Sequence, residues 1–248
     1  MNTDTLVPHD AEAALKAEQD RFDRMFDDID SKVGQALGAF ETGSLAGMPQ
    51  PVQEAWRAMT GALNAAQLKA NGAHSRIRDT ASNDALPKEH RERVVRETRD
   101  QGESEVNDAI ERARTHLAVL EANLRAAAVG SPDANPTSRQ LARDEIRLTL
   151  DQLDPTQVPA AAVDLAGRNG DLASELLGRW GRAYLQSRGF DNVRDFADIE
   201  TAAIAGLATH GQGSQRQAAS AWVGLRRHKI AGQIDARLVA SRYRLGLS

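Results

Sequence analysis

The sequence predicts an all-α protein, in which a long antiparallel coiled-coil-like helical hairpin, extended to a three-helix bundle, precedes a smaller helical domain. Apolar residues recur every three or four positions over long stretches, and only 4% of the residues are aromatic. No segment has the apolar–polar alternation of a strand. Turn-forming residues gather between the periodic stretches, most clearly in GSPDANPTS at 130–138. We therefore expect two domains, residues 1–130 and 131–248.

The first helix is expected at residues 10–42. Asp10 can accept hydrogen bonds from the free amides of the first turn, and Gly43 ends the periodic pattern. The apolar stripe advances by alternating steps of four and three residues, which is the spacing of a coiled-coil seam. Its predicted core positions are Phe22, Phe26, Ile29 and Val33.

The second helix is expected at residues 50–81, and its apolar stripe has the same spacing. The large residues Trp56, Met59 and Leu63 come first, and the stripe then continues mostly in alanine. In a hairpin centred near residue 46, facing residues have numbers that add up to 92. This register places large side chains opposite small ones, for example Trp56 opposite Ala36, as close packing at constant volume requires.

The third helix is expected at residues 87–128, with Pro87 in its first turn. Its second half carries the core positions Ile110, Leu117, Leu120 and Leu124. Its first half is highly charged and contains Gly102, so we expect it to be mostly solvated or to bend there. The end of this helix extends past the tip of the hairpin. Its leucines therefore need a partner in the C-terminal half or in another copy of the chain.

The C-terminal domain should contain shorter helices, each preceded or followed by a capping signal. Thr137 and Gln140 form a capping-box pattern, and Asp171 can cap a later helix. The helices are expected at residues 139–153, after Pro159, at 172–188, at 193–209 and at 214–243.

Charge is distributed unevenly along a chain whose net charge is −4. Residues 1–130 hold 16 basic and 22 acidic residues, whereas the last 48 residues hold seven basic residues and one acidic residue. The last predicted helix has its basic residues near one face. We expect this face to dock an acidic protein surface or, alternatively, to bind nucleic-acid phosphates without sequence specificity. The predicted docking residues are Arg226, Arg227, Lys229, Arg237 and Arg244.

No catalytic, metal or cofactor signature accompanies this architecture. The chain lacks cysteine, and its six histidines form no HExxH or ExxH pair. GRNGD and THGQGSQ lack the strand and lysine of a P-loop and fit helix caps better. The aspartates 20, 23, 27 and 30 could form an acidic docking surface or cation site, but a solvated helix face is favoured. We therefore expect a protein that is not an enzyme and binds no cofactor.

These observations favour a non-enzymatic structural or assembly protein that binds other protein subunits, either itself or an acidic partner. The order of an acidic coiled coil and a basic C-terminal helix resembles that of bacteriophage scaffolding and other virion structural proteins. The alternative is a nucleic-acid-associated protein that uses the basic helix, and a secreted effector or adaptor is a third reading. No signal-peptide pattern or membrane-spanning stretch is evident in the sequence, so a cytoplasmic or virion-associated location is expected.

Overall fold

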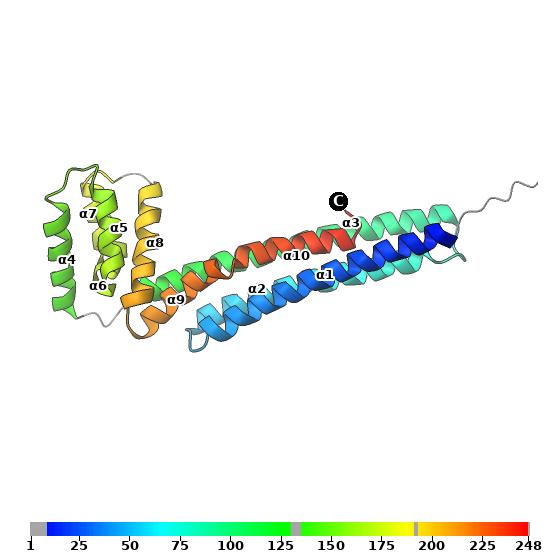
Figure 1. Ribbon diagram of the computed structural model, residues 1–248, viewed down its shortest axis with the longest axis horizontal. Helices are drawn as coiled ribbons and strands as arrows, with labels where there is room; N and C mark the ends of the chain where they lie inside the picture. Colours follow the sequence, from blue (N-terminus) through cyan, green and yellow to red (C-terminus); the bar gives the residue numbers. More distant parts are fainter. Residues whose placement is uncertain (1–8, 130–134, 191–192, 248) are drawn as a thin grey trace, which may run out of the picture. The chain divides into compact units, whose positions relative to one another are not determined.

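The computed structural model describes residues 9–129, 135–190 and 193–247, with side chains for all of these except 9–16, 18, 19, 22 and 193–195. Within these ranges the regular secondary structure is entirely α-helical, which confirms the predicted all-α class (Figure 1). The helices are α1 (His9–Ser44), α2 (Gln50–Ala81), α3 (Lys88–Val129), α4 (Pro136–Leu150), α5 (Val158–Arg168), α6 (Gly170–Leu177), α7 (Arg179–Ser187), α8 (Val193–His210), α9 (Gly213–Arg227) and α10 (Ile230–Arg244).

The chain forms two compact units made of interleaved segments. Unit 1 comprises Met1–Gly38, Met59–Arg114 and Ala231–Ser248, and unit 2 comprises Ala39–Ala58 and Thr115–Ile230. The first three helices contribute residues to both units. The sequence suggested contiguous domains that divide at residue 130. Each of these units instead combines segments from different parts of the chain.

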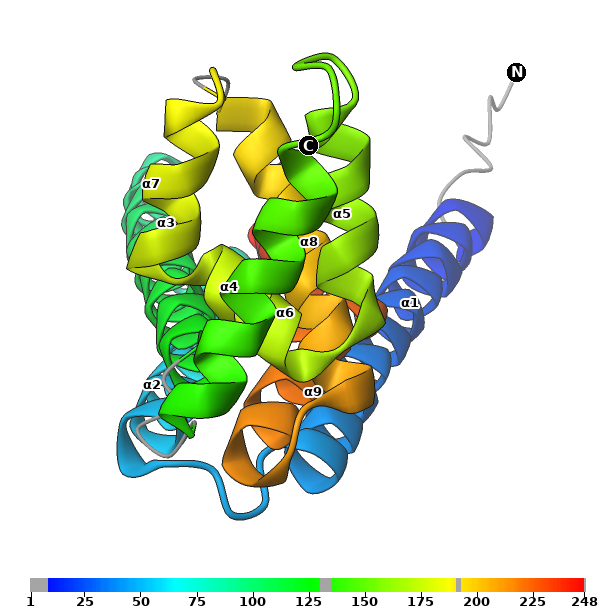
Figure 2. The ribbon, with the colours of Figure 1, turned by 90° about the vertical axis from the view of Figure 1, so that its left-hand side faces the viewer.

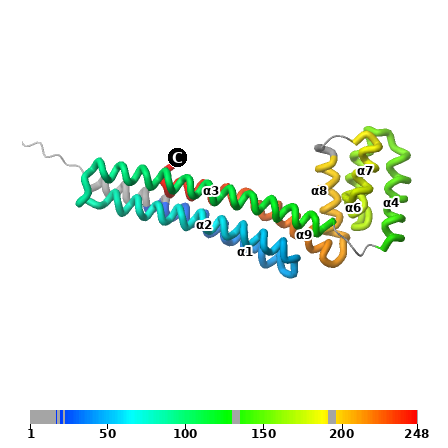
Figure 3. The backbone as a smooth tube through the Cα atoms, turned by 180° about the vertical axis from the view of Figure 1, so that it is seen from behind, coloured from blue at the N-terminus to red at the C-terminus, as the bar shows by residue number. Residues whose placement is uncertain are grey.

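Unit 1 is built from parts of α1, α2, α3 and α10, which lie side by side in Figures 1 and 3. Its core combines large residues with alanines, and these side chains are buried: Phe26, Val33, Met59, Leu63, Ala66, Ala70, Ala73, Ala109, Ile110 and Ala113. Ile29 is half-buried, and the side chain of Phe22 lies outside the described residues. Small residues along α2 and α3 leave room for the larger ones.

Gly102 is a point of close approach between α3 and its neighbours in unit 1. A Cβ at this position would lie 2.9 Å from the Cβ of Ala73 and 3.0 Å from the side chain of Leu245. The helix is continuous through Gly102, and the glycine is buried. Residues 88–101 are exposed or half-buried, which agrees with the expectation that this half is mostly solvated, and Gly102 itself allows close helix packing.

The hairpin of α1 and α2 has a different register from the predicted one. In unit 2 the ring centroids of Phe40 and Trp56 lie 4.9 Å apart, and in unit 1 Gln67 donates a 2.8 Å hydrogen bond to Asp30. The residue numbers add up to 96 in the first pair and to 97 in the second, whereas the predicted sum was 92. Helices α1 and α2 are therefore shifted along each other by about one helical turn relative to the prediction. Helix α1 runs on to Ser44, which moves the hairpin centre toward higher numbers. Side chains also lean toward the N-terminus of their own helix. Each patch of the helix surface is therefore covered by the side chain of a residue about one position later in the sequence.

Unit 2 is organised around α8, which packs against α5, α6 and α9, while α4 packs against α5 and α6 (Figure 2). The end of α3 is anchored here, since Leu117, Leu120 and Leu124 are buried. Arg125 follows them, and its Nε lies 3.1 Å from Oε1 of Glu200 on α8. The partner that these leucines needed is thus supplied by the chain itself.

Two capping predictions in unit 2 are wrong. Helix α4 is capped by Asn135, whose Oδ1 accepts a 3.0 Å hydrogen bond from the Thr137 amide. Helix α6 is capped by Asn169, which accepts from the Leu172 amide at 2.9 Å, instead of by Asp171. Asparagine is as good an N-cap as aspartate or serine, so sequence preference alone did not decide between neighbouring candidates.

Two of the three helices predicted after residue 170 are broken. The helix expected at 172–188 divides at Gly178, whose extended backbone (ψ 170°) separates α6 from α7. The helix expected at 214–243 divides into α9 and α10 at Lys229, which has a positive φ of 50°. The apolar spacing continues across each break, which explains why a periodic pattern could not reveal either one.

Candidate interaction surface

The five predicted docking residues do not share one exposed face. Arg226, Arg227 and Lys229 lie at the end of α9 in unit 2, and all three are exposed. The guanidinium of Arg226 lies 4.0 Å from the ring centroid of Trp222, a cation–π contact that orients this side chain. These three residues therefore form a compact basic cluster, which we call the α9 basic cluster.

Arg237 and Arg244 occupy a different environment in unit 1, where α10 packs on α1. Only 3% of Arg237 is exposed, and its Nη1 lies 2.7 Å from Oδ1 of Asp30. Arg244 contacts Oδ2 of Asp30 at 2.5 Å and Oδ1 of Asp27 at 3.1 Å. The expectation that these arginines are exposed is wrong. The break at Lys229 removes the common helical face, and carboxylates of α1 attract both guanidinium groups inward.

Asp30 is the centre of a buried polar cluster in unit 1. It accepts from Gln67 of α2 in addition to contacting the two arginines of α10. His74 extends the cluster, since its Nδ1 lies 2.7 Å from the Arg244 carbonyl oxygen. Burial lowers the pKa of Arg237, and the nearby charge of Asp30 opposes that shift. The acidic stripe of α1 is thus partly an internal partner for α10, which the favoured reading of a solvated face missed.

Helix α4 presents an exposed apolar surface in unit 2. Leu141 and Leu148 are 65% and 67% exposed, and they lie two helical turns apart on one side. The opposite side of α4 buries Ala142, Ile146 and Leu150 against the rest of the unit. We call the exposed pair, together with the neighbouring Asp144 and Glu145, the α4 face. The sequence contains this apolar pair outside the buried stripe of the helix, and neither leucine is among the predicted site residues.

An aromatic stack joins α7 to α4 nearby in unit 2. The rings of Trp180 and Tyr184 lie 5.2 Å apart and nearly parallel, and the guanidinium groups of Arg143 and Arg147 lie 5.4 Å from the Trp180 centroid. The Tyr184 hydroxyl donates a 2.6 Å hydrogen bond to Asp151. Burial, followed by this bond, raises the pKa of Tyr184 to about 12. The two rings, the two guanidinium groups and the Asp151 carboxylate are thus partners of one another, and their contacts stabilise the position of α7.

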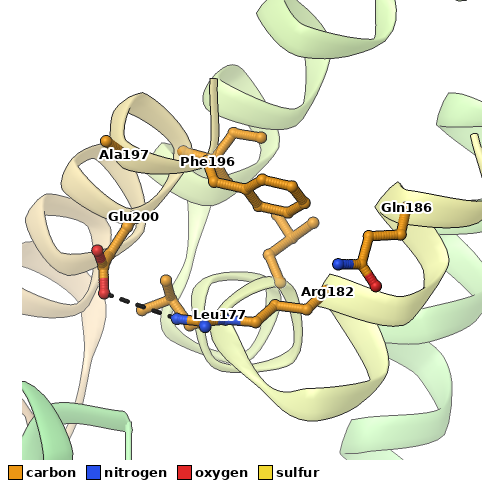
Figure 4. A pocket seen from close by; sticks show the side chains of 8 residues that line it. Leu177, Arg182, Gln186, Phe196, Ala197 and Glu200 are labelled. Atoms are coloured by element: carbon orange, nitrogen blue, oxygen red, sulfur yellow. Dashed lines mark ion pairs between the residues drawn. The ribbon is translucent and has the colours of Figure 1, made fainter. Parts of the chain in front are cut away.

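A pocket of about 290 Å³ lies between α6, α7 and α8 (Figure 4). Leu177 and Phe196 contribute apolar walls, and Arg182 approaches Glu200 across it with Nη2 and Oε1 4.0 Å apart. The same Glu200 oxygen also lies 3.1 Å from Nε of Arg125. Two guanidinium groups thus neutralise the carboxylate, and the pocket offers no paired acid and base.

Comparisons with protein families, with curated proteins and with solved structures gave no match to this chain. Among the described residues, no three His, Asp or Glu side chains gather in a way that could hold a metal ion. No helix in the described ranges has the length and apolarity needed to cross a membrane. The α4 face and the α9 basic cluster are both exposed surfaces of unit 2.

Proposed function

We propose that this chain is a non-enzymatic assembly protein that associates with copies of itself through the α4 face. The observation that carries the proposal is the exposure of Leu141 and Leu148 on one side of a helix whose other side is already packed. Single exposed leucines are ordinary on soluble proteins, whereas apolar groups gathered on one face with a polar rim favour a binding surface.

The charges beside these leucines support a basic partner. Asp144 and Glu145 lie next to the apolar pair, so pairing α4 with α4 of a second copy would bring like charges together. The α9 basic cluster has the complementary charge, and it lies beside the exposed apolar residue Val223. A second copy can therefore provide the acidic surface that the basic helix was predicted to dock on.

A contact between α4 of one copy and α9 of the next is heterologous, because the two surfaces differ. Repetition of such a contact produces a ring or an open filament. This property suits a protein that builds or organises a larger particle, and a virion or scaffolding role is the form of assembly that we propose.

The test uses the purified chain and measures its molar mass by light scattering over a range of concentrations. We expect association for the unmodified chain, and monomers for the double variant Leu141→Glu, Leu148→Glu. Leu68→Glu is the matched control, because Leu68 is 71% exposed but stands alone on α2. A monomeric unmodified chain would refute the proposal, and so would unchanged association of the double variant.

A second candidate function, non-specific nucleic-acid binding, is favoured by one observation. Arg226, Arg227 and Lys229 are exposed, and none forms an ion pair with a described carboxylate. Three phosphate contacts predict that the logarithm of the binding constant falls with the logarithm of salt concentration with a slope of about −2.7. Titration of labelled duplex DNA at several salt concentrations tests this, with Arg226→Glu, Arg227→Glu as the variant. The leucine double variant should leave such binding unchanged, which separates the two candidates.

A further inference from the structure

A cleft of about 360 Å³ lies within unit 1, lined by residues of α1, α2, α3 and the end of α10. Its volume is in the range of small-molecule sites. Phe26 and Tyr243 supply one apolar wall, with their rings stacked at a centroid distance of 5.5 Å and an angle of 22°, and Ile77 supplies another. The cleft is therefore shaped for an apolar body of modest size.

The unusual feature of this cleft is Arg99. Its side chain is partly buried, and its Nε is fully buried with no hydrogen-bond acceptor among the described residues. The carboxylate one turn later on the same helix, Glu103, is used elsewhere, since its Oε1 lies 3.1 Å from Nη2 of Arg242. This Nε is unfavourable where it stands, because it belongs to a charged group and has lost water without gaining a partner.

The turn that follows α10 covers the Arg99 guanidinium. Gly246 has a φ of 71°, and a Cβ at this residue would lie 3.4 Å from Nη2 of Arg99. This backbone shields the cation from one side, while the open cleft gives access from another. An anion that enters the cleft would thus meet a pre-positioned guanidinium in a partly desolvated site.

The other polar groups of the cleft do not provide this anion or compete for it. Arg244 is already neutralised by Asp27 and Asp30. His74 must donate from Nδ1, because its partner is a carbonyl oxygen, so its neutral form leaves only an acceptor at Nε2. Asp23 also lines the cleft, but no ion pair joins its described carboxylate to Arg99. Among the described residues that line the cleft, Arg99 is therefore a cation that forms no ion pair with a described carboxylate.

We propose that the cleft binds a small organic carboxylate with an aromatic or aliphatic body. The carboxylate pairs with Arg99 through charge-assisted hydrogen bonds, and the apolar body lies against Phe26, Ile77 and Tyr243. This site lies in unit 1 and does not depend on the assembly role proposed for unit 2.

The experiment titrates the full chain with phenylacetate and with its uncharged analogue phenylacetamide, and measures affinity by calorimetry or ligand-observed NMR. We expect phenylacetate to bind at least about tenfold more tightly than phenylacetamide, as a charged hydrogen bond implies. Arg99→Gln should abolish this preference, whereas Arg96→Gln, at an exposed arginine of the same helix, should retain it. Circular dichroism confirms that both variants are folded.

Three results would overturn the proposal. They are equal affinity for the two compounds, the same phenylacetate affinity in Arg99→Gln as in the unmodified chain, and no detectable phenylacetate binding at millimolar concentrations. The size of any assembly formed by the chain is not part of this readout, so failure of the assembly proposal leaves the test intact.

Discussion

Replacing Asp30 with alanine should destabilise unit 1 more than any other change of a single charge in that unit. The Asp30 carboxylate contacts two guanidinium groups of α10 and accepts from Gln67. Without it, Arg237 keeps its buried position but loses its only described carboxylate partner. Arg244 retains Asp27, so the penalty falls mainly on Arg237.

The expected loss in the free energy of unfolding is about 3–5 kcal/mol, the cost of leaving a buried charge without its partner. Asp27→Ala is the control, because Asp27 is 78% exposed and an exposed ion pair contributes about 0–1 kcal/mol. Replacing both charges, with Asp30→Ala and Arg237→Met, should restore part of the loss, since no unpaired buried charge then remains.

Urea unfolding followed by circular dichroism at 222 nm measures these differences. The tryptophans at positions 56, 180 and 222 all belong to unit 2, so an unchanged native emission spectrum shows that unit 2 keeps its fold in each variant. Equal stability of Asp30→Ala and Asp27→Ala would refute the claim that the cluster is buried and paired. A double variant that loses at least as much stability as Asp30→Ala would refute the claim that the unpaired Arg237 causes the penalty.

Three further changes test other parts of the structure. Phe40→Ala should cost about 3–5 kcal/mol and alter the emission of the adjacent Trp56, because the Phe40 ring is fully buried. Gly206→Ala should cost at least about 1–3 kcal/mol, measured by thermal unfolding, because the added Cβ would overlap the carbonyl oxygen of Ala166 where α5 and α8 meet. The pKa of Tyr184 rises from 10.0 to about 12 on folding, so the unfolded phenol ionises first and stability falls between pH 10 and about 12. Tyr184→Phe should remove that part of the decline, measured by urea unfolding at a series of alkaline pH values.

Two of these changes have matched control variants. Gly61→Ala adds a Cβ that meets nothing within 4 Å on α2, so it should stabilise the helix by about 0.5–1 kcal/mol. If Gly206→Ala behaved in the same way, α5 and α8 would not approach as closely as described. Val239→Ala, at an exposed position, is the control for Phe40→Ala, and an equal cost for the two would argue against burial of the Phe40 ring. A pH profile of Tyr184→Phe identical to that of the unmodified chain would exclude the raised phenol pKa.

The long helices and much of their core could be predicted from the sequence because they depend on local periodicity. The expected bounds 50–81 match α2, and of the core positions named in advance Trp56, Met59 and Leu63 are all fully or almost fully buried. The register of the hairpin could not be predicted to better than a turn. The register depends on where α1 ends and on the direction in which side chains lean. The spacing of apolar residues indicates neither of these.

The breaks at Gly178 and Lys229 escaped prediction for a related reason. Both interruptions preserve the apolar spacing, and a lysine with positive φ gives no turn signal of the kind that glycine or asparagine gives. The α4 face also could not be identified, because the sequence does not tell which apolar residues of a short helix remain uncovered. The neighbours that decide this, α5 and α6, come later in the chain.

The uneven charge of the chain is a weaker guide to partners than it first suggests. The acidic first helix and the basic last helix invite the inference that each binds something of opposite sign. In unit 1 they bind each other, because Asp27 and Asp30 contact Arg237 and Arg244. Much of the asymmetry thus holds α10 in place, and Arg237 and Arg244 are not available to an outside partner.

Fewer of the predicted docking residues remain to bind an external partner, and they lie in unit 2. The α9 basic cluster is exposed in unit 2, and the acidic groups beside Leu141 and Leu148 have the opposite sign. Charge alone would favour any polyanion for this cluster, including nucleic acid. The cluster also adjoins the exposed Val223, and a protein surface that offers both acidic and apolar groups, as the α4 face does, matches this combination better than phosphates, which offer no apolar contact. This combination is why we place assembly ahead of nucleic-acid binding, and why the leucine variants, more than the arginine variants, decide between the two.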